Sequence, residues 1–101
     1  MTDRKIMYNL IEEELAEANK KNPLFADSHH AYGVLKEEVE ELHEETVACE
    51  GLLSEMWCRI REDMDVEDIL RQIKMHAVDA AREAIQVAAM AQKALDSLNK
   101  E

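Results

Sequence analysis

Residues that interrupt helices are almost missing from this sequence. Its 101 residues include two glycines and one proline, and the strongest break is Asn22-Pro23. Because glycine and proline mark turns, their scarcity excludes folds built from many short strands. No alternating strand pattern is visible either. We therefore expect an all-α protein with few turns, in which residues 1–101 form a single domain.

Positive charge is also scarce. Lys and Arg together number 12 against 23 Asp and Glu, which gives a formal net charge of −11. Nucleic-acid backbones and anionic membrane surfaces attract basic patches, so we expect neither as a partner. A metal ion or a cationic partner fits the charge better. An anionic ligand would need a metal between two like charges.

Cysteines and long apolar runs are few. Cys49 and Cys58 lie nine positions apart in one predicted helix, too far along its axis for a disulfide, and we expect both to be reduced. The longest purely apolar run, residues 87–91, is far too short to span a bilayer. Met1 leads into polar residues without the apolar core of a signal peptide. We expect a cytoplasmic protein.

Hydrophobic spacing predicts three helices. The first is followed by a loop over residues 20–28. The second starts at a cap formed by Asp27 or Ser28, and the third starts at Asp65, which resembles a capping residue with Asp68 three positions later. The first helix is expected to start near Thr2 or Asp3, to end near Asn19, and to place Met7, Leu10, Ile11, Leu15 and Ala18 on one face.

The second and third helices each carry a long seam of apolar residues at alternating spacings of four and three, as in heptad repeats. Alanine dominates the middle of the third helix, and small side chains let helices approach closely. We expect a long antiparallel hairpin with arms of about 50 Å at 1.5 Å per residue. The seam of the second helix is Leu35, Val39, Leu42, Thr46, Cys49, Leu53, Met56 and Ile60. The seam of the third is Val66, Leu70, Ile73, Ala77, Ala80, Ala84, Val87, Ala91, Ala94 and Leu98.

One short helix cannot cover two such arms. A monomer would leave apolar surface exposed along them, and large exposed apolar patches mark interaction sites. The simplest remedy is a symmetric oligomer that completes a core of the four-helix-bundle type. We therefore expect a homodimer or a homotetramer.

The most informative feature of the sequence is a run of glutamates in the second helix. Only Lys36 lies beside them as a counter-charge. Like charges three or four positions apart on a helix cost about 0.2–0.5 kcal/mol per pair. A hard divalent cation prefers carboxylate oxygens and would turn this repulsion into binding energy. A solvated acidic face is the alternative interpretation. The run consists of Glu37, Glu38, Glu40, Glu41, Glu44 and Glu45.

Helical geometry separates these glutamates. At 100° per residue, Glu38, Glu41 and Glu45 project from one flank of the seam, and the other three point further away. A polar stripe on the third helix consists of His76, Asp79, Glu83, Gln86 and Met90. We expect His76 to be a packing residue or a partner of Asp79, not a metal ligand.

The register of the hairpin decides whether the two clusters meet. With the turn centred near Met64, equal rise along both arms places Glu41 level with Gln86 or Val87. Glu45 is then level with Glu83. We expect four oxygen-bearing side chains to converge at one height.

The segment at residues 35–42, Leu-Lys-Glu-Glu-Val-Glu-Glu-Leu, resembles a helix of the MazG-like all-α nucleoside triphosphate pyrophosphohydrolases, whose pattern is Glu-x-x-Glu followed by leucine. In that family a second helix carries Glu-x-x-Asp, and the four carboxylates hold magnesium ions that bind the triphosphate. The similar segment here is Glu83-Ala-Ile-Gln86. The resemblance covers mainly residues 31–94 and implies that Glu38, Glu41 and Glu83 are metal ligands. Gln86 offers a neutral carbonyl in place of the aspartate, which should weaken divalent binding.

The resemblance further implies hydrolysis of a nucleoside triphosphate to a monophosphate and pyrophosphate, with Mg2+ as cofactor and Mn2+ as its alternative. Glu37 or Glu45 is a candidate base for the attacking water. Lys93 and Arg82 are candidate phosphate partners, and ordinary surface charges are the alternative. The competing function is a non-catalytic helical oligomer for binding or assembly that keeps the scaffold with a degraded metal site.

Overall fold

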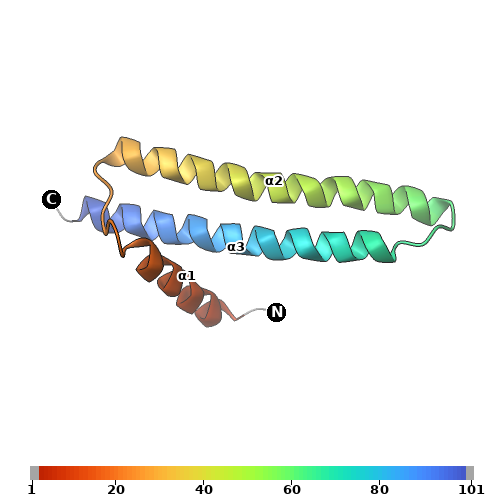
Figure 1. Cartoon of the computed structure of the whole chain (residues 1–101), viewed down its shortest axis with the longest axis horizontal. Coiled ribbons are helices and arrows are strands. Elements are labelled where there is room, and N and C mark those ends of the chain that lie inside the picture. Colours follow the sequence, from red (N-terminus) through yellow and green to blue (C-terminus); the bar gives the residue numbers. More distant parts are fainter. Residues whose placement is uncertain (1–2, 100–101) are drawn as a thin grey trace.

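The computed structural model describes residues 3–99 and consists of three α-helices (Figure 1). They are α1 (Arg4–Ala18), α2 (Ser28–Arg61) and α3 (Glu67–Leu98). No strand occurs within the described residues, so the expected all-α class is confirmed. The two long helices run antiparallel as a hairpin, and α1 packs against α3 (Figure 1).

Side-chain caps start the first two helices where the sequence predicts them. The Asp3 carboxylate accepts a hydrogen bond from the backbone N–H of Lys5 at 2.9 Å. Asp27 likewise accepts from the N–H of His30 at 2.8 Å. Each bond satisfies one of the amide donors that a helix start leaves without a partner. The other predicted start of α1, Thr2, lies outside the described residues.

The start of α3 differs from the prediction. Val66, not Asp65, occupies the cap position, and it makes no side-chain capping bond. The Asp65 carboxylate instead accepts from the N–H of Glu67 at 3.2 Å. Glu67 and Asp68 then place negative charge in the first turn, where the helix dipole favours it. The acidic residues were therefore correctly interpreted as a helix start, but the cap lies one residue later than predicted.

A Schellman-type turn ends α2. The backbone N–H of Met64 donates to the carbonyl of Arg59 at 2.9 Å, and that of Asp63 donates to the carbonyl of Ile60 at 3.2 Å. Asp63 has a φ of 54°, the left-handed conformation that this turn requires. In Figure 1 the connection then runs back beside the end of α2 before α3 begins.

This backward path changes the register of the hairpin. Glu45 lies beside His76, with their side chains 2.7 Å apart, and not beside Glu83 as expected. Cys49 is correspondingly level with Ile73, whose carbonyl lies 4.0 Å from the Cys49 Sγ. The prediction of equal rise from a turn centred near Met64 was wrong because the connecting residues consume length along the helix axis. Neither Cys49 nor Cys58 forms a disulfide within the described residues.

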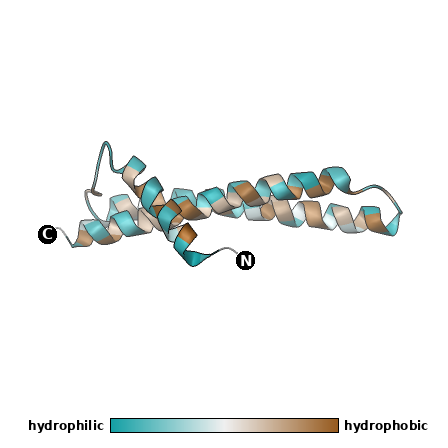
Figure 2. Ribbon diagram, turned by 90° about the horizontal axis from the view of Figure 1, so that it is seen from below, coloured by the Kyte–Doolittle hydropathy of each residue, from teal (hydrophilic) through white to brown (hydrophobic). Residues whose placement is uncertain are grey.

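The hairpin has a thin core. Among the described residues, the buried apolar ones are Phe25, Ala31, Ile69 and Ala89. Figure 2 shows hydrophobic ribbon recurring along both long helices and alternating with hydrophilic ribbon. Sixteen large apolar side chains of the described part are exposed. A single chain therefore buries only a small part of its apolar side chains.

Each predicted seam contains one row of residues that faces the other arm and one that does not. In α2, Leu35, Leu42, Cys49 and Met56 are partly buried, whereas the second row is exposed: Val39, Thr46, Leu53 and Ile60. In α3, Leu70, Ala77, Ala84, Ala91 and Leu98 are exposed in the same way. The position that the second row of α2 was expected to fill is taken by a row containing Glu38 and Glu45, both partly buried. The heptad spacing was right, but the orientation of the helices was wrong by one row.

Candidate metal site

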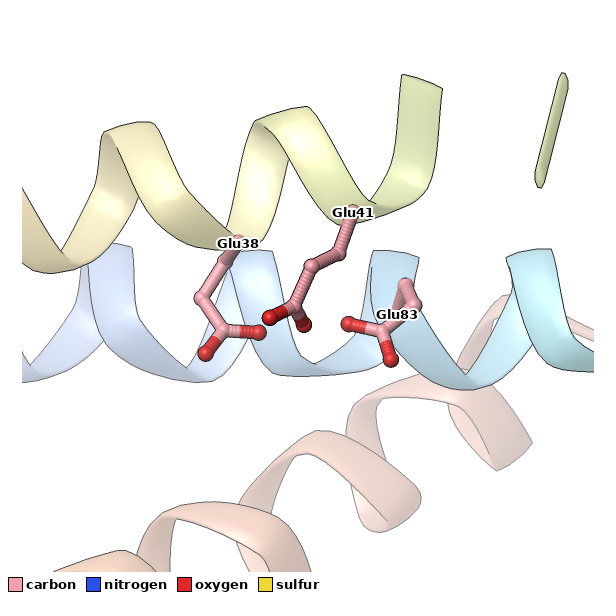
Figure 3. A group of neighbouring side chains, drawn as sticks. All are labelled: Glu38, Glu41 and Glu83. Carbon is pink, nitrogen blue, oxygen red and sulfur yellow. The ribbon is translucent and has the colours of Figure 1, made fainter. Parts of the chain in front are cut away.

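Three glutamates meet between the two arms of the hairpin. Glu38 and Glu41 come from α2 and Glu83 comes from α3, and Figure 3 shows the three side chains converging. One oxygen from each carboxylate lies within 4.8 Å of the other two. Glu38 and Glu41 share a face of α2 because three residues nearly complete one helical turn. Of the side chains that the register was expected to bring together, Glu41 and Glu83 meet, whereas Glu45 does not, and Glu38 completes the cluster.

The carboxylates of this cluster lack partners that would compensate their charge. All three residues are partly buried. One oxygen of Glu38 and one of Glu83 are fully buried without a hydrogen-bond partner in the described part of the chain. A buried polar atom without a partner costs about 1–3 kcal/mol, and more when it is charged. A cation bound by these oxygens would remove that cost.

The electrostatics of the cluster agree with its geometry. The pKa of Glu38 is raised above 4.5, first because burial removes water from the carboxylate and next because Glu41 is close. The pKa of Glu41 is raised as well, first by a hydrogen bond with the Glu83 carboxyl and next by the Glu83 charge. Like charges brought together disfavour ionisation unless a positive charge joins them. Repulsion between the carboxylates therefore favours the binding of either protons or a cation at this site.

Glu45 is separated from this cluster by its contact with His76. Nδ1 of His76 lies 2.7 Å from Oε2 of Glu45, and the two side chains are 27% and 25% exposed. His76 was expected to be a packing residue or a partner of Asp79, and it partners Glu45 instead. The other candidate base, Glu37, is exposed on α2, and its charge contributes to the raised pKa of Glu38 and of Glu41.

The remaining predicted site residues lie at different distances from the cluster. Gln86 is partly buried, about one helical turn along α3 from Glu83. Arg82 is 74% exposed in its side chain and pairs with Asp79 at 3.9 Å. Lys93 is 6% exposed, and its ammonium lies 4.9 Å from the centre of the Phe25 ring. The Lys93 ammonium therefore already has a cation–π partner.

Sequence reasoning missed a fourth acidic residue near the cluster. Glu14 of α1 is partly buried, and its charge adds to the raised pKa of Glu38. Ile11 and Leu15 of α1 are partly buried as well, and they line a pocket together with Ala88 of α3. An acid on an otherwise apolar helical face is the signal that could have identified it.

Comparison of the chain with protein-family models, with curated proteins and with solved structures found no match. In the part that the structure describes, no helix is both long and apolar enough to cross a membrane.

Proposed function

We propose that this chain is a Mg2+-dependent nucleoside triphosphate pyrophosphohydrolase that assembles as a homodimer or homotetramer in the cytoplasm. The observation that carries the proposal is the approach of Glu38, Glu41 and Glu83 to within 4.8 Å across two helices. The buried oxygens of Glu38 and Glu83 that lack hydrogen-bond donors support it, because hard divalent cations prefer such carboxylate oxygens as ligands. The resemblance of residues 35–42 and 83–86 to the MazG-like pattern suggests the reaction.

The residues have distinct roles in this proposal. Glu38, Glu41 and Glu83 would hold Mg2+, or Mn2+ in its place, and Gln86 would contribute a neutral carbonyl. When bound, the ion would supply positive charge to neutralise phosphate oxygens and Lewis acidity for an attacking water. Glu37 is exposed and adjacent to the cluster, so it is free to accept a proton from water.

Glu45 suits a different role from Glu37. Its carboxylate already contacts the His76 imidazole at 2.7 Å, so it is less available than Glu37 to an attacking water. Arg82 is the more accessible of the two candidate phosphate partners, since its side chain is 74% exposed and Lys93 is buried against Phe25. We therefore assign substrate contact to Arg82 before Lys93.

The second candidate is a non-catalytic helical oligomer for binding or assembly. Gln86 favours it, because the neutral amide lowers the charge that the cluster offers to a cation. The extensive exposed apolar surface of the hairpin is also consistent with a protein whose main task is association.

A pyrophosphate-release screen across the common ribo- and deoxyribonucleoside triphosphates, with Mg2+ or Mn2+, tests the proposal. We expect release with at least one substrate, and a loss of at least a hundredfold in Glu41→Gln. Glu40→Gln is the matched control, because Glu40 belongs to the same glutamate run but has a side chain that is 62% exposed and outside the cluster. Silence of the folded protein across the panel would favour the assembly protein.

A further inference from the structure

One broad face of the hairpin is exposed along its whole length. On α2, a row at intervals of seven residues is exposed, with Tyr32 at 67%, Leu53 at 61% and Val39 at 48%. On α3, a second row at the same interval begins and ends with Leu70 at 48% and Leu98 at 60%. The rows are Tyr32, Val39, Thr46, Leu53 and Ile60 on α2, and Leu70, Ala77, Ala84, Ala91 and Leu98 on α3. Neither row contains a charged residue, although the chain carries a net charge of −11.

Helical geometry places both rows on the same side of the hairpin. Each member of the α2 row directly follows an inward-facing position, as Val39 follows Glu38. Each member of the α3 row does the same, as Ala84 follows Glu83. A step of one residue rotates both arms by 100°, and in an antiparallel pair these rotations lead to the same side. We call this surface, made by the two rows, the heptad face.

The two rows are also level with each other. Glu41 lies beside Glu83 within the chain, so Val39 and Ala84 differ in height by only about 1.5 Å at 1.5 Å per residue. Because both rows repeat every seven residues, the same relation pairs Tyr32 with Ala91 and Leu53 with Leu70, and Thr46 with Ala77. Large side chains in the α2 row thus lie level with mostly small side chains in the α3 row.

We infer that the heptad face binds the heptad face of a second copy of this chain, with a two-fold axis parallel to the helices. This axis keeps every residue at its own height and places α2 of one copy on α3 of the other. Val39 then lies opposite Ala84 of the partner subunit, and Tyr32 lies opposite Ala91 of the partner subunit. The large side chains of the α2 row in one copy then pack over the small side chains of the α3 row in the other copy. The result is a bundle of four helices in which neighbouring helices are antiparallel.

The size of the surface suits a stable dimer. The rows extend over roughly 42 Å of helix, and two helices side by side are roughly 20 Å wide. Their product is roughly 800 Å2 for each copy, the size of a standard specific interface. Because the large and small rows lie at equal heights on one chain, the face is complementary to itself, which favours a second copy over an unrelated partner.

The heptad face leaves the glutamate cluster accessible. Glu41 follows Glu38 by three residues, so it points toward the opposite edge of the hairpin from Val39. The inference rests on the self-association in the proposed function but not on metal binding or catalysis. Experiments can therefore disprove self-association without disproving metal binding, and the reverse.

Two valines of equal exposure provide a matched test. Val39 and Val47 are both 48% exposed on α2, but Val47 lies about 80° further around the helix, away from the heptad face. In sedimentation experiments at about 50 µM, we expect wild type and Val47→Glu to be dimers or tetramers of equal mass. Val39→Glu should associate at least a hundredfold more weakly while retaining its helical circular dichroism and its response to Mg2+. A monomeric wild type, or a Val39→Glu variant that associates like Val47→Glu, would overturn the inference.

Disulfide trapping tests the orientation of the two copies. In a background carrying Cys49→Ala and Cys58→Ser, chains with Val39→Cys are mixed with chains with Ala84→Cys and oxidised. We expect a covalent heterodimer, and at least tenfold less cross-linked product from either variant alone. Efficient cross-linking of Val39→Cys or Thr46→Cys with itself would place α2 against α2 of the partner and would contradict the proposed axis.

Discussion

Nδ1 of His76 on α3 lies 2.7 Å from Oε2 of Glu45 on α2, in the partly buried space between the two arms of the hairpin. This contact fixes the register of the arms at one point, and the glutamate cluster fixes it at a second. At both points the hairpin carries polar side chains on its inner face. Changes to side chains between the two arms should therefore affect both the stability of the hairpin and the candidate metal site.

Removal of the imidazole should leave the Glu45 carboxylate partly buried without its partner. We expect His76→Ala to lower the free energy of unfolding by about 1–3 kcal/mol, the cost of an unsatisfied polar group. Urea denaturation measures it. Arg82→Ala is the control, because the exposed Arg82–Asp79 pair, 3.9 Å apart, should contribute under about 0.5 kcal/mol. Equal losses in the two variants would contradict a structural role for the His76–Glu45 contact.

The raised pKa values of Glu38 and Glu41 predict how the metal-free protein responds to pH. A carboxyl whose pKa is higher in the folded than in the unfolded state binds more protons when folded. Its stabilising contribution is complete below the ordinary value of 4.5 and is lost as the pH rises through the raised value. Ionisation of the cluster therefore destabilises the metal-free protein.

Glu41→Gln tests this sign. With chelator present, the stability of the variant relative to wild type should increase as the pH rises from about 4 to 7, because the variant lacks the charge that Glu83 opposes. Urea denaturation of both proteins at several pH values measures the difference. Glu40→Gln should show a much smaller change. A relative stability of Glu41→Gln that falls with increasing pH would contradict the cluster electrostatics.

Gln86→Asp should change metal-free and metal-bound stability in opposite directions. The added carboxylate supplies a charged oxygen to the site, so we expect Mg2+ to bind roughly tenfold more tightly, which corresponds to about 1.4 kcal/mol. Without metal the same charge should destabilise the protein by repulsion. Thermal unfolding with chelator and with millimolar Mg2+ measures both effects. The same direction of change under both conditions would show that Gln86 does not border a cation site.

The turn between the long helices offers a stability prediction away from the site. Asp63 has a φ of 54°, which glycine adopts without strain. We expect Asp63→Gly to stabilise the protein by about 0.5–1 kcal/mol. Glu62→Gly is the control, because the φ of Glu62 is −105° and glycine there only adds freedom to the unfolded chain. A loss of stability in Asp63→Gly would contradict the turn geometry.

The features that could be predicted from the sequence are those set by neighbouring residues. Helix content follows from the scarcity of glycine and proline, and the Asp27 cap follows from local hydrogen bonding. The register could not be predicted because it depends on the path of the connection after Asp63. Glu38, Glu41 and Glu83 still converge, since they lie close enough in height to meet despite the shift.

Orientation of the long helices was harder to predict than their spacing. A heptad pattern identifies apolar rows but does not specify which row faces the other arm of the hairpin and which faces a second copy. Val39 was placed in the seam, yet it is 48% exposed, while Glu38 beside it is partly buried. The contact of Glu45 with His76 was missed for the same reason, because it requires both register and rotation.

Calorimetric titration with Mg2+ tests most directly whether Glu38, Glu41 and Glu83 form a metal site. We expect a saturable isotherm for wild type and for Glu40→Gln, since Glu40 lies outside the cluster. Binding by Glu41→Gln should be at least tenfold weaker because one charged ligand is lost. Identical weak isotherms for all three proteins, matched by sodium chloride at equal ionic strength, would contradict the account and leave the glutamate run as a solvated helical face.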